Sequence, residues 1–250
     1  MEKESSKRSN VCGIFNFAPH YRLPIYKLMS DELGIDFYFC NKLPYTDSIK
    51  KIDYSLLPTF KKEVILGKLR GRRRWKGMLS LIFKPYDIYI ITPDHRNITQ
   101  CLFLLLCKLM GKKVVAWWHG VAPGYQGKGR DWKEKKFFYN LFAGNFIYGD
   151  KAREYMDEIK FPAKNKLTIY NSLDYDASVE KRKDSLTSPI YKEHFGNSNP
   201  VLVFIGRLTK VKKLDMIIAA HQMLLEQGIK TNVVFIGGGE ESYGFLIGDF

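Results

Sequence analysis

The sequence has few cysteines, and none is placed for a disulfide framework or a metal site. Only four cysteines occur among the 250 residues, and they are Cys12, Cys40, Cys101 and Cys107. They form no Cys-x-x-Cys pair and share no ligand spacing with a histidine, which disfavours a zinc site and the disulfide-rich class of secreted domains. We therefore expect a reduced, cytoplasmic compartment and no bound metal.

The chain also lacks an apolar run long enough to cross a bilayer. The apolar block Cys101–Leu106 is far shorter than the roughly 20 residues that a membrane-spanning helix needs. The polar start of the chain leads into an apolar segment that Asn16 and Pro19 interrupt too early for a signal peptide. A soluble or surface-attached protein is expected, with the block around Leu104 forming a buried helix.

Acidic residues are too few to balance the basic ones, and the excess cations are clustered. The formal net charge is +14, and basic clusters surround Trp75 and Trp132. Cations interleaved with aromatic rings suit an anionic membrane surface, where each basic residue contributes about 1 kcal/mol, and they also suit nucleic acid. Since no nucleic-acid-binding motif accompanies them, we expect no nucleic acid and prefer a peripheral membrane contact. A solvated helix face with its aromatics in the core is the alternative.

The expected elements alternate as in a doubly wound α/β domain. The expected strands are Val11–Phe15, Asp36–Phe39, Lys62–Leu66, Asp87–Ile91, Lys113–Trp118, Asn145–Tyr148 and Leu167–Ile169. The expected helices are Leu23–Leu33, Trp75–Phe83, Ile98–Met110, Lys133–Ala143 and Asp150–Ile159. Residues 1–170 are therefore predicted to form one domain. An interdomain connection over residues 171–199 carries a helix at Tyr191–Phe195, and a second domain begins at residue 200.

The first strand is not followed by the glycines of a dinucleotide-binding fingerprint. The loop from Asn16 to Arg22 reads Asn-Phe-Ala-Pro-His-Tyr-Arg. No acidic residue stands where a nucleotide ribose would be bound, so a nicotinamide-dependent oxidoreductase is a distant candidate.

The second domain begins with the pattern of a βαβ unit. Apolar runs of strand length at Val201–Ile205 and Asn232–Ile236 flank a helical pattern at Leu214–Gln227. Such a unit belongs to a parallel sheet, whose carboxyl edge is where open α/β folds bind ligands.

Cations crowd the turn after the first strand of this unit. Gly206 and Arg207 are followed, five residues after the arginine, by Lys212. A guanidinium binds phosphate oxygens bidentately and an ammonium adds a compact charge, so these two cations are predicted to hold a diphosphate at the helix N-terminus. The glycine turn Gly237–Gly239 is expected to border the same crevice. A solvated basic turn is the alternative.

This pattern resembles the nucleotide-sugar domain of the retaining glycosyltransferases of family 4. The matching positions are Gly206, Arg207, Lys212, Gly237 and Gly239. The resemblance implies a GT-B-like α/β fold with two Rossmann-like domains, a donor diphosphate bound by Arg207 and Lys212, a nucleotide against the glycine turn, and retention of anomeric configuration. Fixed cations there would stabilise the leaving diphosphate in the transition state, without a metal or other cofactor.

In the first domain the resemblance points to two loops. His20, Tyr21 and Arg22 resemble the acceptor-side loop of some family members, although this chain lacks the Gly-Gly pair of many others. Arg22 is a candidate for holding an anionic acceptor, and an exposed helix-terminal residue is the alternative. His119 follows an apolar strand at the cleft edge of the sheet, where the family has a histidine, so it is the first catalytic candidate and His95 the second.

The sequence departs from the family pattern near its end. Family members continue with further strands and two glutamates eight residues apart, whereas this sequence stops at Phe250. Glu240 and Glu241 cannot replace that pair, because neighbouring residues on a helix do not share a face. An incomplete second domain over residues 200–250, impaired transfer and a complementing C-terminal fragment as partner are expected.

The predicted function is transfer of a sugar from a nucleotide-diphosphate sugar to a polysaccharide or lipid-linked acceptor in cell-envelope glycan synthesis. The segment Tyr170–Asp174 resembles the family's link between its two domains. A nonenzymatic module that binds a membrane or a partner protein, derived from such an enzyme, is the alternative function.

Overall fold

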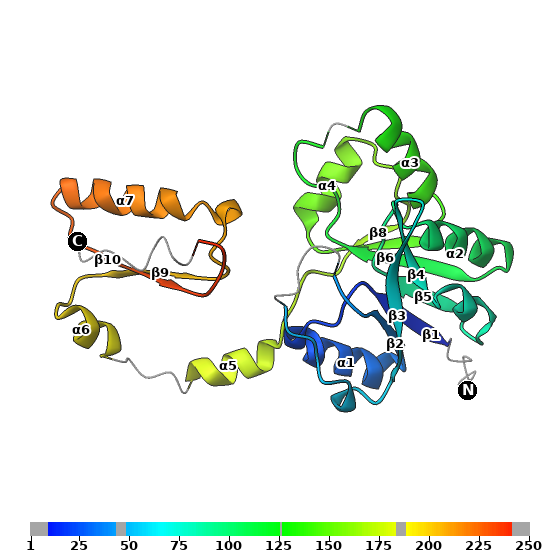
Figure 1. Ribbon diagram of the computed structural model, residues 1–250, viewed down its shortest axis with the longest axis horizontal. Helices are drawn as coiled ribbons and strands as arrows, with labels where there is room; N and C mark the ends of the chain where they lie inside the picture. Colours follow the sequence, from blue (N-terminus) through cyan, green and yellow to red (C-terminus); the bar gives the residue numbers. More distant parts are fainter. Residues whose placement is uncertain (1–9, 44–48, 126, 184–188, 242–250) are drawn as a thin grey trace, which may run out of the picture. The chain divides into compact units, whose positions relative to one another are not determined.

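The computed structural model describes residues 10–43, 49–125, 127–183 and 189–241 (Figure 1). The chain divides into two compact units, Met1–Glu180 and Lys181–Phe250, here called the first and the second unit. Each unit has its own sheet and is described by itself.

The first unit is built on one eight-stranded sheet with helices on both faces (Figure 1). Its strands are β1 (Val11–Phe15), β2 (Asp36–Cys40), β3 (Phe60–Leu69), β4 (Arg72–Lys76), β5 (Ile88–Ile91), β6 (Lys113–Trp118), β7 (Gly144–Ile147) and β8 (Lys166–Thr168). Their order is β4-β3-β2-β1-β5-β6-β7-β8, and every pair is parallel except β3 with β4. The strand order reverses between β1 and β5, which makes this the topological switch point of the sheet.

The helices of the first unit begin and end where short sequence signals place them. They are α1 (Leu23–Leu33), α2 (Ile98–Leu109), α3 (Gly129–Tyr139) and α4 (Asp150–Glu158), with short 3-10 helices at His20–Arg22, Tyr54–Leu56 and Leu79–Phe83. Helix α5 (Tyr175–Lys183) begins in the first unit and continues past its last residue, Glu180. Helix α1 ends at Gly34, whose φ of 62° suits a residue without a Cβ. Helix α2 begins after Asn97, whose side chain accepts hydrogen bonds from the backbone N–H groups of Thr99 and Gln100.

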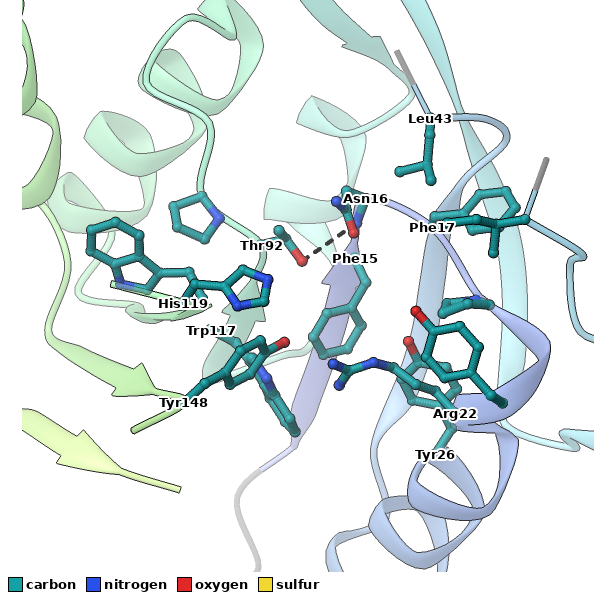
Figure 2. Close-up of a pocket in the computed structure, with 15 residues that line it drawn as sticks. Phe15, Asn16, Phe17, Arg22, Tyr26, Leu43, Thr92, Trp117, His119 and Tyr148 are labelled. Atoms are coloured by element: carbon teal, nitrogen blue, oxygen red, sulfur yellow. Dashed lines mark hydrogen bonds between the residues drawn. The ribbon is translucent and has the colours of Figure 1, made fainter. Parts of the chain in front are cut away.

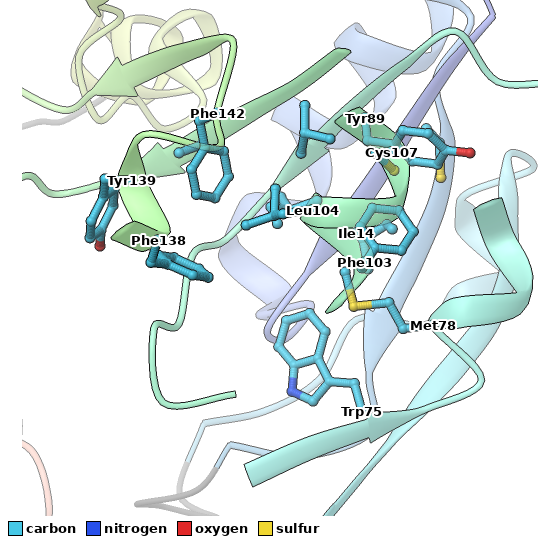
Figure 3. Packing of buried hydrophobic residues seen from close by; sticks show 14 of the residues in the cluster. Ile14, Trp75, Met78, Tyr89, Phe103, Leu104, Cys107, Phe138, Tyr139 and Phe142 are labelled. Carbon is cyan, nitrogen blue, oxygen red and sulfur yellow. The ribbon is translucent and has the colours of Figure 1, made fainter. Parts of the chain in front are cut away.

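The core lies in two layers, one on each face of the sheet. On one face Phe37 and Phe39 of β2 stack with ring centroids 5.5 Å apart and pack in one cluster with α1. On the other face Tyr89 of β5 meets Phe103 of α2 edge-on at 5.0 Å, within a cluster that continues to α3 (Figure 3). Burying a side chain of this size contributes about 1.5–3 kcal/mol to the free energy of unfolding. These two layers therefore fix the sheet from which the loops of the site extend.

The prediction of a helix over Trp75–Phe83 is wrong. Residues 60–76 form the β3–β4 hairpin, and a 3-10 helix follows at Leu79–Phe83. Arg70 and Gly71, with φ of 48° and 76°, make the two-residue turn, and Leu69 pairs with Arg72 across it. Two positive φ values in succession fit a hairpin turn of type I′. This turn places Arg72–Lys76 in a strand, although the apolar spacing that starts at Trp75 predicts a helix.

The aromatic rings of the two basic clusters are mostly buried. Trp75 is 4% exposed in the core, and Phe138 and Tyr139 of α3 are also buried, whereas Phe137 is 55% exposed. The buried rings are not available to a membrane surface, which supports the solvated-face alternative for their clusters. Within the described ranges, no helix is both long and apolar enough to cross a bilayer.

The second unit has the βαβ order that the sequence predicts. Strands β9 (Val201–Ile205) and β10 (Asn232–Ile236) pair in parallel, and α7 (Leu214–Glu226) connects them. The predicted strands are confirmed at the same bounds, and the helix is one residue shorter. Helix α6 (Ile190–Phe195) precedes β9, and a 3-10 helix at Lys210–Lys212 leads into α7.

Candidate functional site

A cavity of about 280 Å³ lies at the carboxyl ends of β1, β5, β6 and β7 in the first unit (Figure 2). It therefore lies at the switch point of the sheet, where doubly wound folds bind ligands. Its lining residues are Phe15, Asn16, Phe17, Pro19, Tyr21, Arg22, Tyr26, Leu43, Ile49, Thr92, Pro93, Trp117, Trp118, His119 and Tyr148. Aromatic and apolar walls with a few convergent polar groups are typical of a small-molecule site.

Arg22 brings a fixed positive charge into this cavity. It stands at the start of α1, on the same cavity as Tyr148 (Figure 2), and its guanidinium lies 5.3 Å from the ring centroid of that tyrosine. Its Nη2 donates a hydrogen bond to Oδ1 of Asn171. The structure records no carboxylate paired with Arg22 in the ranges that it describes. A held, half-buried guanidinium without a counterion can bind an anionic ligand group.

His119 reaches the same cavity from the end of β6. Its ring meets Tyr148 edge-on, with ring centroids 4.5 Å apart and an interplanar angle of 89°. Loss of solvent around the imidazole lowers the pKa of His119, and the positive charge of Arg22 lowers it further. His119 is therefore neutral at pH 7, and it can donate one hydrogen bond and accept another.

Replacing Arg22 with glutamine is expected to raise the pKa of His119. The cation disfavours the imidazolium, so its removal relieves that contribution, while desolvation still holds the pKa below the ordinary value of about 6.5. NMR titration of the imidazole would measure the change. Lys27→Gln, which removes an exposed cation of α1, is the control and should leave the titration unchanged.

The same lowered pKa has a consequence for stability. The unfolded chain takes up a proton at His119 at a higher pH than the folded protein does, so this residue lowers the free energy of unfolding as the pH falls through about 6.5.

The titration of the Arg22→Gln variant also has a contradicting outcome. If its His119 titrated as in the wild type, the close electrostatic coupling of the two side chains would be disproved.

Two other histidines lie outside this cavity. His20 does not line it, because its Nδ1 is 3.2 Å from the carbonyl oxygen of Lys50. His95 lines a neighbouring cavity of about 230 Å³ that shares Asn16, Leu43, Thr92 and Pro93 with the first, and its Nε2 is 3.3 Å from a carboxylate oxygen of Asp131 on α3. The structure thus brings Tyr21, Arg22 and His119 together and places His20 and His95 elsewhere.

Sequence reasoning missed two side chains that orient Arg22. Tyr148 follows directly after β7, so the rule that ligand groups follow parallel strands could have found it. Asn171 lies far from Arg22 in sequence, and no local pattern predicts their hydrogen bond. Asp174, in the same segment, has a local role, because its Oδ1 accepts a hydrogen bond from the N–H of Ala177 at the start of α5.

The predicted diphosphate residues lie in the second unit. Arg207 follows β9, and Lys212 ends the 3-10 helix before α7; both side chains are exposed. Across residues 189–241 the structure records no hydrogen bond or ion pair from either side chain. Helix α7 begins at Leu214, so its free N–H groups open toward this loop.

The glycine turn is joined to the cationic loop by backbone contacts. The N–H of Gly206 donates to the carbonyl of Ile236 at 2.9 Å, and the N–H of Leu208 donates to that of Gly238 at 3.0 Å. A Cβ on Gly237 would overlap the carbonyl oxygen of Gly206, and one on Gly239 would overlap that of Leu208. The two loops can lie this close only because both positions are glycine.

Comparisons with known proteins show the fold. No protein-family model matches the sequence, and no curated protein matches it. The UDP-N-acetylglucosamine 2-epimerase of Methanocaldococcus jannaschii is similar in structure, with a TM-score of 0.51, 12% identity, and coverage of 90% of this chain and 65% of its own. A protein of Listeria monocytogenes assigned the same activity has a TM-score of 0.50 and 14% identity, with coverage of 91% and 62%.

The chain spans less than two thirds of the length of these neighbours. At such low identity the likeness shows the fold alone. That fold is α/β and GT-B-like, with a large parallel sheet flanked by helices, and the prediction of this fold class is confirmed.

Proposed function

We propose that this chain acts on nucleotide sugars, and that it transfers a sugar from a nucleotide-diphosphate sugar to a glycan or lipid-linked acceptor. The observation that carries the proposal is the loop after β9. There Arg207 and Lys212 have exposed side chains beside the N-terminus of α7, and neither side chain has a hydrogen bond or ion pair within residues 189–241. Two exposed cations next to free helix N–H groups suit a diphosphate. The neighbours in fold are named for a UDP sugar, which supports the same class of donor.

The first unit supplies an acceptor side in this proposal. Its aromatic walls suit a sugar ring, and Arg22 suits an anionic group such as the diphosphate of a lipid-linked acceptor. His119, neutral at pH 7, hydrogen-bonds a hydroxyl of the reacting sugar or acceptor. Negative charge grows on the donor diphosphate as the glycosidic bond breaks, and Arg207 and Lys212 stabilise that charge most in the transition state.

Arg207→Gln and Lys212→Gln are each expected to weaken the binding of a nucleoside diphosphate. A hydrogen bond to a charged group contributes about 1.5–3 kcal/mol, which corresponds to roughly 10-fold to 150-fold in affinity. Calorimetry with UDP would measure the change. Lys230→Gln removes an exposed cation at the opposite end of α7 and should bind as the wild type does. Equal affinity in all four proteins would contradict the proposed donor site.

The reaction class is tested by its need for an acceptor. The protein is incubated with a panel of UDP sugars, with and without a polyprenyl diphosphate sugar, and products are followed by NMR. Transfer predicts that UDP is released only when the acceptor is present. Isomerisation of the UDP sugar without acceptor would show an epimerase instead, and binding without dependence on nucleotide would favour the nonenzymatic alternative.

A further inference from the structure

We propose that the first unit has a second anion site, a pocket lined by arginines that binds a phosphate-bearing or diphosphate-bearing group. The pocket has a volume of about 430 Å³ and is lined by Gly71, Arg72, Arg73, Arg96, Arg130 and Glu134. We call it the arginine pocket. It shares no lining residue with the cavity that holds Arg22 and His119, so it goes beyond the proposed transfer reaction.

Three separate elements bring these arginines together. Arg72 and Arg73 open β4 after the hairpin turn, Arg96 lies in the loop between β5 and α2, and Arg130 lies in the first turn of α3. An isolated bridge joins Arg73 to Asn97 and ties the hairpin to the loop. The pocket is therefore a feature of the tertiary fold.

The carboxylates near the pocket do not balance its guanidinium groups. Asp94 binds Arg73, with 2.7 Å between Oδ2 and Nε. Glu134 accepts from Nε of Arg130 at 3.0 Å, and the same oxygen is 3.6 Å from Nη2 of Arg72, which is too far for a hydrogen bond. For the side chain of Arg96 the structure records no hydrogen bond or ion pair within its described ranges. With Asp94 on Arg73 and Glu134 on Arg130 and near Arg72, four guanidiniums are opposed by two carboxylates.

The other acidic side chain of this region is engaged elsewhere. Asp131, next to Arg130, accepts from Lys135 at 2.8 Å and from the hydroxyl of Tyr125 at 2.9 Å, and it also lies beside His95. These partners lower the pKa of Asp131, so it is ionised and held. It does not neutralise the arginines, and the excess positive charge of the pocket stays available to a ligand.

A phosphate-type anion is the chemistry that fits this arrangement. Like charges held together are unfavourable until a counterion binds between them. Guanidinium groups form paired, planar hydrogen bonds that match the oxygens of a phosphate. The first N–H groups of α3, which begins at Gly129, add a favourable dipole on the same side. A group with two negative charges would offset much of the excess.

The donor-site variant Arg207→Gln/Lys212→Gln is the background for the test, so that the second unit contributes little binding. Calorimetry with inorganic pyrophosphate should show binding by this background protein, about 10-fold weaker binding after Arg96→Gln, and no change after Lys27→Gln. Arg96 is exposed and outside the core, so an unchanged melting temperature checks that Arg96→Gln is folded.

A second measurement separates a free anion from a lipid headgroup. Retention is compared on phosphatidylcholine vesicles with and without phosphatidic acid. Retention that needs phosphatidic acid and falls with Arg96→Gln identifies the lipid phosphate as the source, whereas Arg96-dependent binding of pyrophosphate alone identifies a soluble one. The proposal is overturned if neither probe binds, or if Arg96→Gln and Lys27→Gln behave alike. UDP also carries a diphosphate, so UDP is titrated into Arg96→Gln as well. The donor site predicts that Arg207→Gln and Lys212→Gln weaken UDP binding in the presence and in the absence of Arg96.

Discussion

Replacing Gly237 by alanine is expected to unfold the second unit. The new methyl group would overlap the carbonyl oxygen of Gly206, and the φ of 152° at this position is one that residues with a Cβ rarely adopt. The obstacle is backbone, which cannot turn aside as a flexible side chain would, so β9 and β10 must move apart. A cost above about 4 kcal/mol is expected, in the range that indicates a specific structural conflict.

Hydrogen exchange is the suitable measurement, because all four tryptophans belong to the first unit and fluorescence does not report on the second. The amides of β9 and β10 should lose protection in Gly237→Ala and in Gly239→Ala, whose methyl group would overlap the carbonyl oxygen of Leu208. Gly238→Ala is the matched control, because its Cβ would meet open space, and a change within about 0.5 kcal/mol is expected. Equal protection in all three variants would disprove the close approach of the loops.

Two glycines of the glycosyltransferase-like pattern have a structural role in the second unit. Gly237 and Gly239 match the family pattern, and the structure gives each of them a role in packing one loop against another. Their presence therefore follows from the fold, with or without a nucleotide. The functional content of the pattern rests on Arg207 and Lys212, whose exposed side chains have no such structural role in residues 189–241.

Much of the fold could be predicted because the strands are short apolar runs bounded by polar or glycine residues. The bounds of β1, β6, β9, β10 and α1 match the predictions. Helices α2 and α4 end one residue earlier than predicted, and α3 lies four residues earlier at both ends. The first strand of the hairpin was predicted at Lys62–Leu66, inside β3, but its second strand β4 was missed. Strand β4 is strongly cationic, as exposed edge strands often are, and its local sequence resembles a basic helix face. Helix α5 was missed because a polar, charged segment gives no apolar periodicity.

Some residues of the candidate sites could be predicted from the local sequence, and others could not. Arg22 and His119 could be found because each lies just beyond a predicted strand or at a predicted helix start. The hydrogen bond between Arg22 and Asn171 joins two residues that lie 149 positions apart in the sequence. The arginine pocket likewise draws on three elements, and its cations were visible in sequence only as members of separate charge runs. Contacts between distant segments carry no local pattern, so only the structure shows them.

Replacing Gln100 with leucine is expected to destabilise the first unit by roughly 2–6 kcal/mol. Gln100 is fully buried at the start of α2, where its Oε1 accepts from the N–H of Asp94 at 2.8 Å and its Nε2 donates to the carbonyl of Thr92 at 3.0 Å. Leucine has a similar size but no polar atoms, so it leaves one donor and one acceptor without their partner. Each unsatisfied group costs about 1–3 kcal/mol.

Denaturant unfolding followed by tryptophan fluorescence isolates this effect, because the four tryptophans lie in the first unit. Lys108→Leu, at an exposed position of α2 in the same unit, is the control and should change the midpoint little. The loop that Gln100 holds supplies Thr92 and Pro93 to the first cavity and Arg96 to the arginine pocket. Gln100→Leu should therefore also increase hydrogen exchange at the amide of Asp94. An unchanged midpoint would mean that the loop is held by other contacts, and that the two sites do not depend on one buried amide.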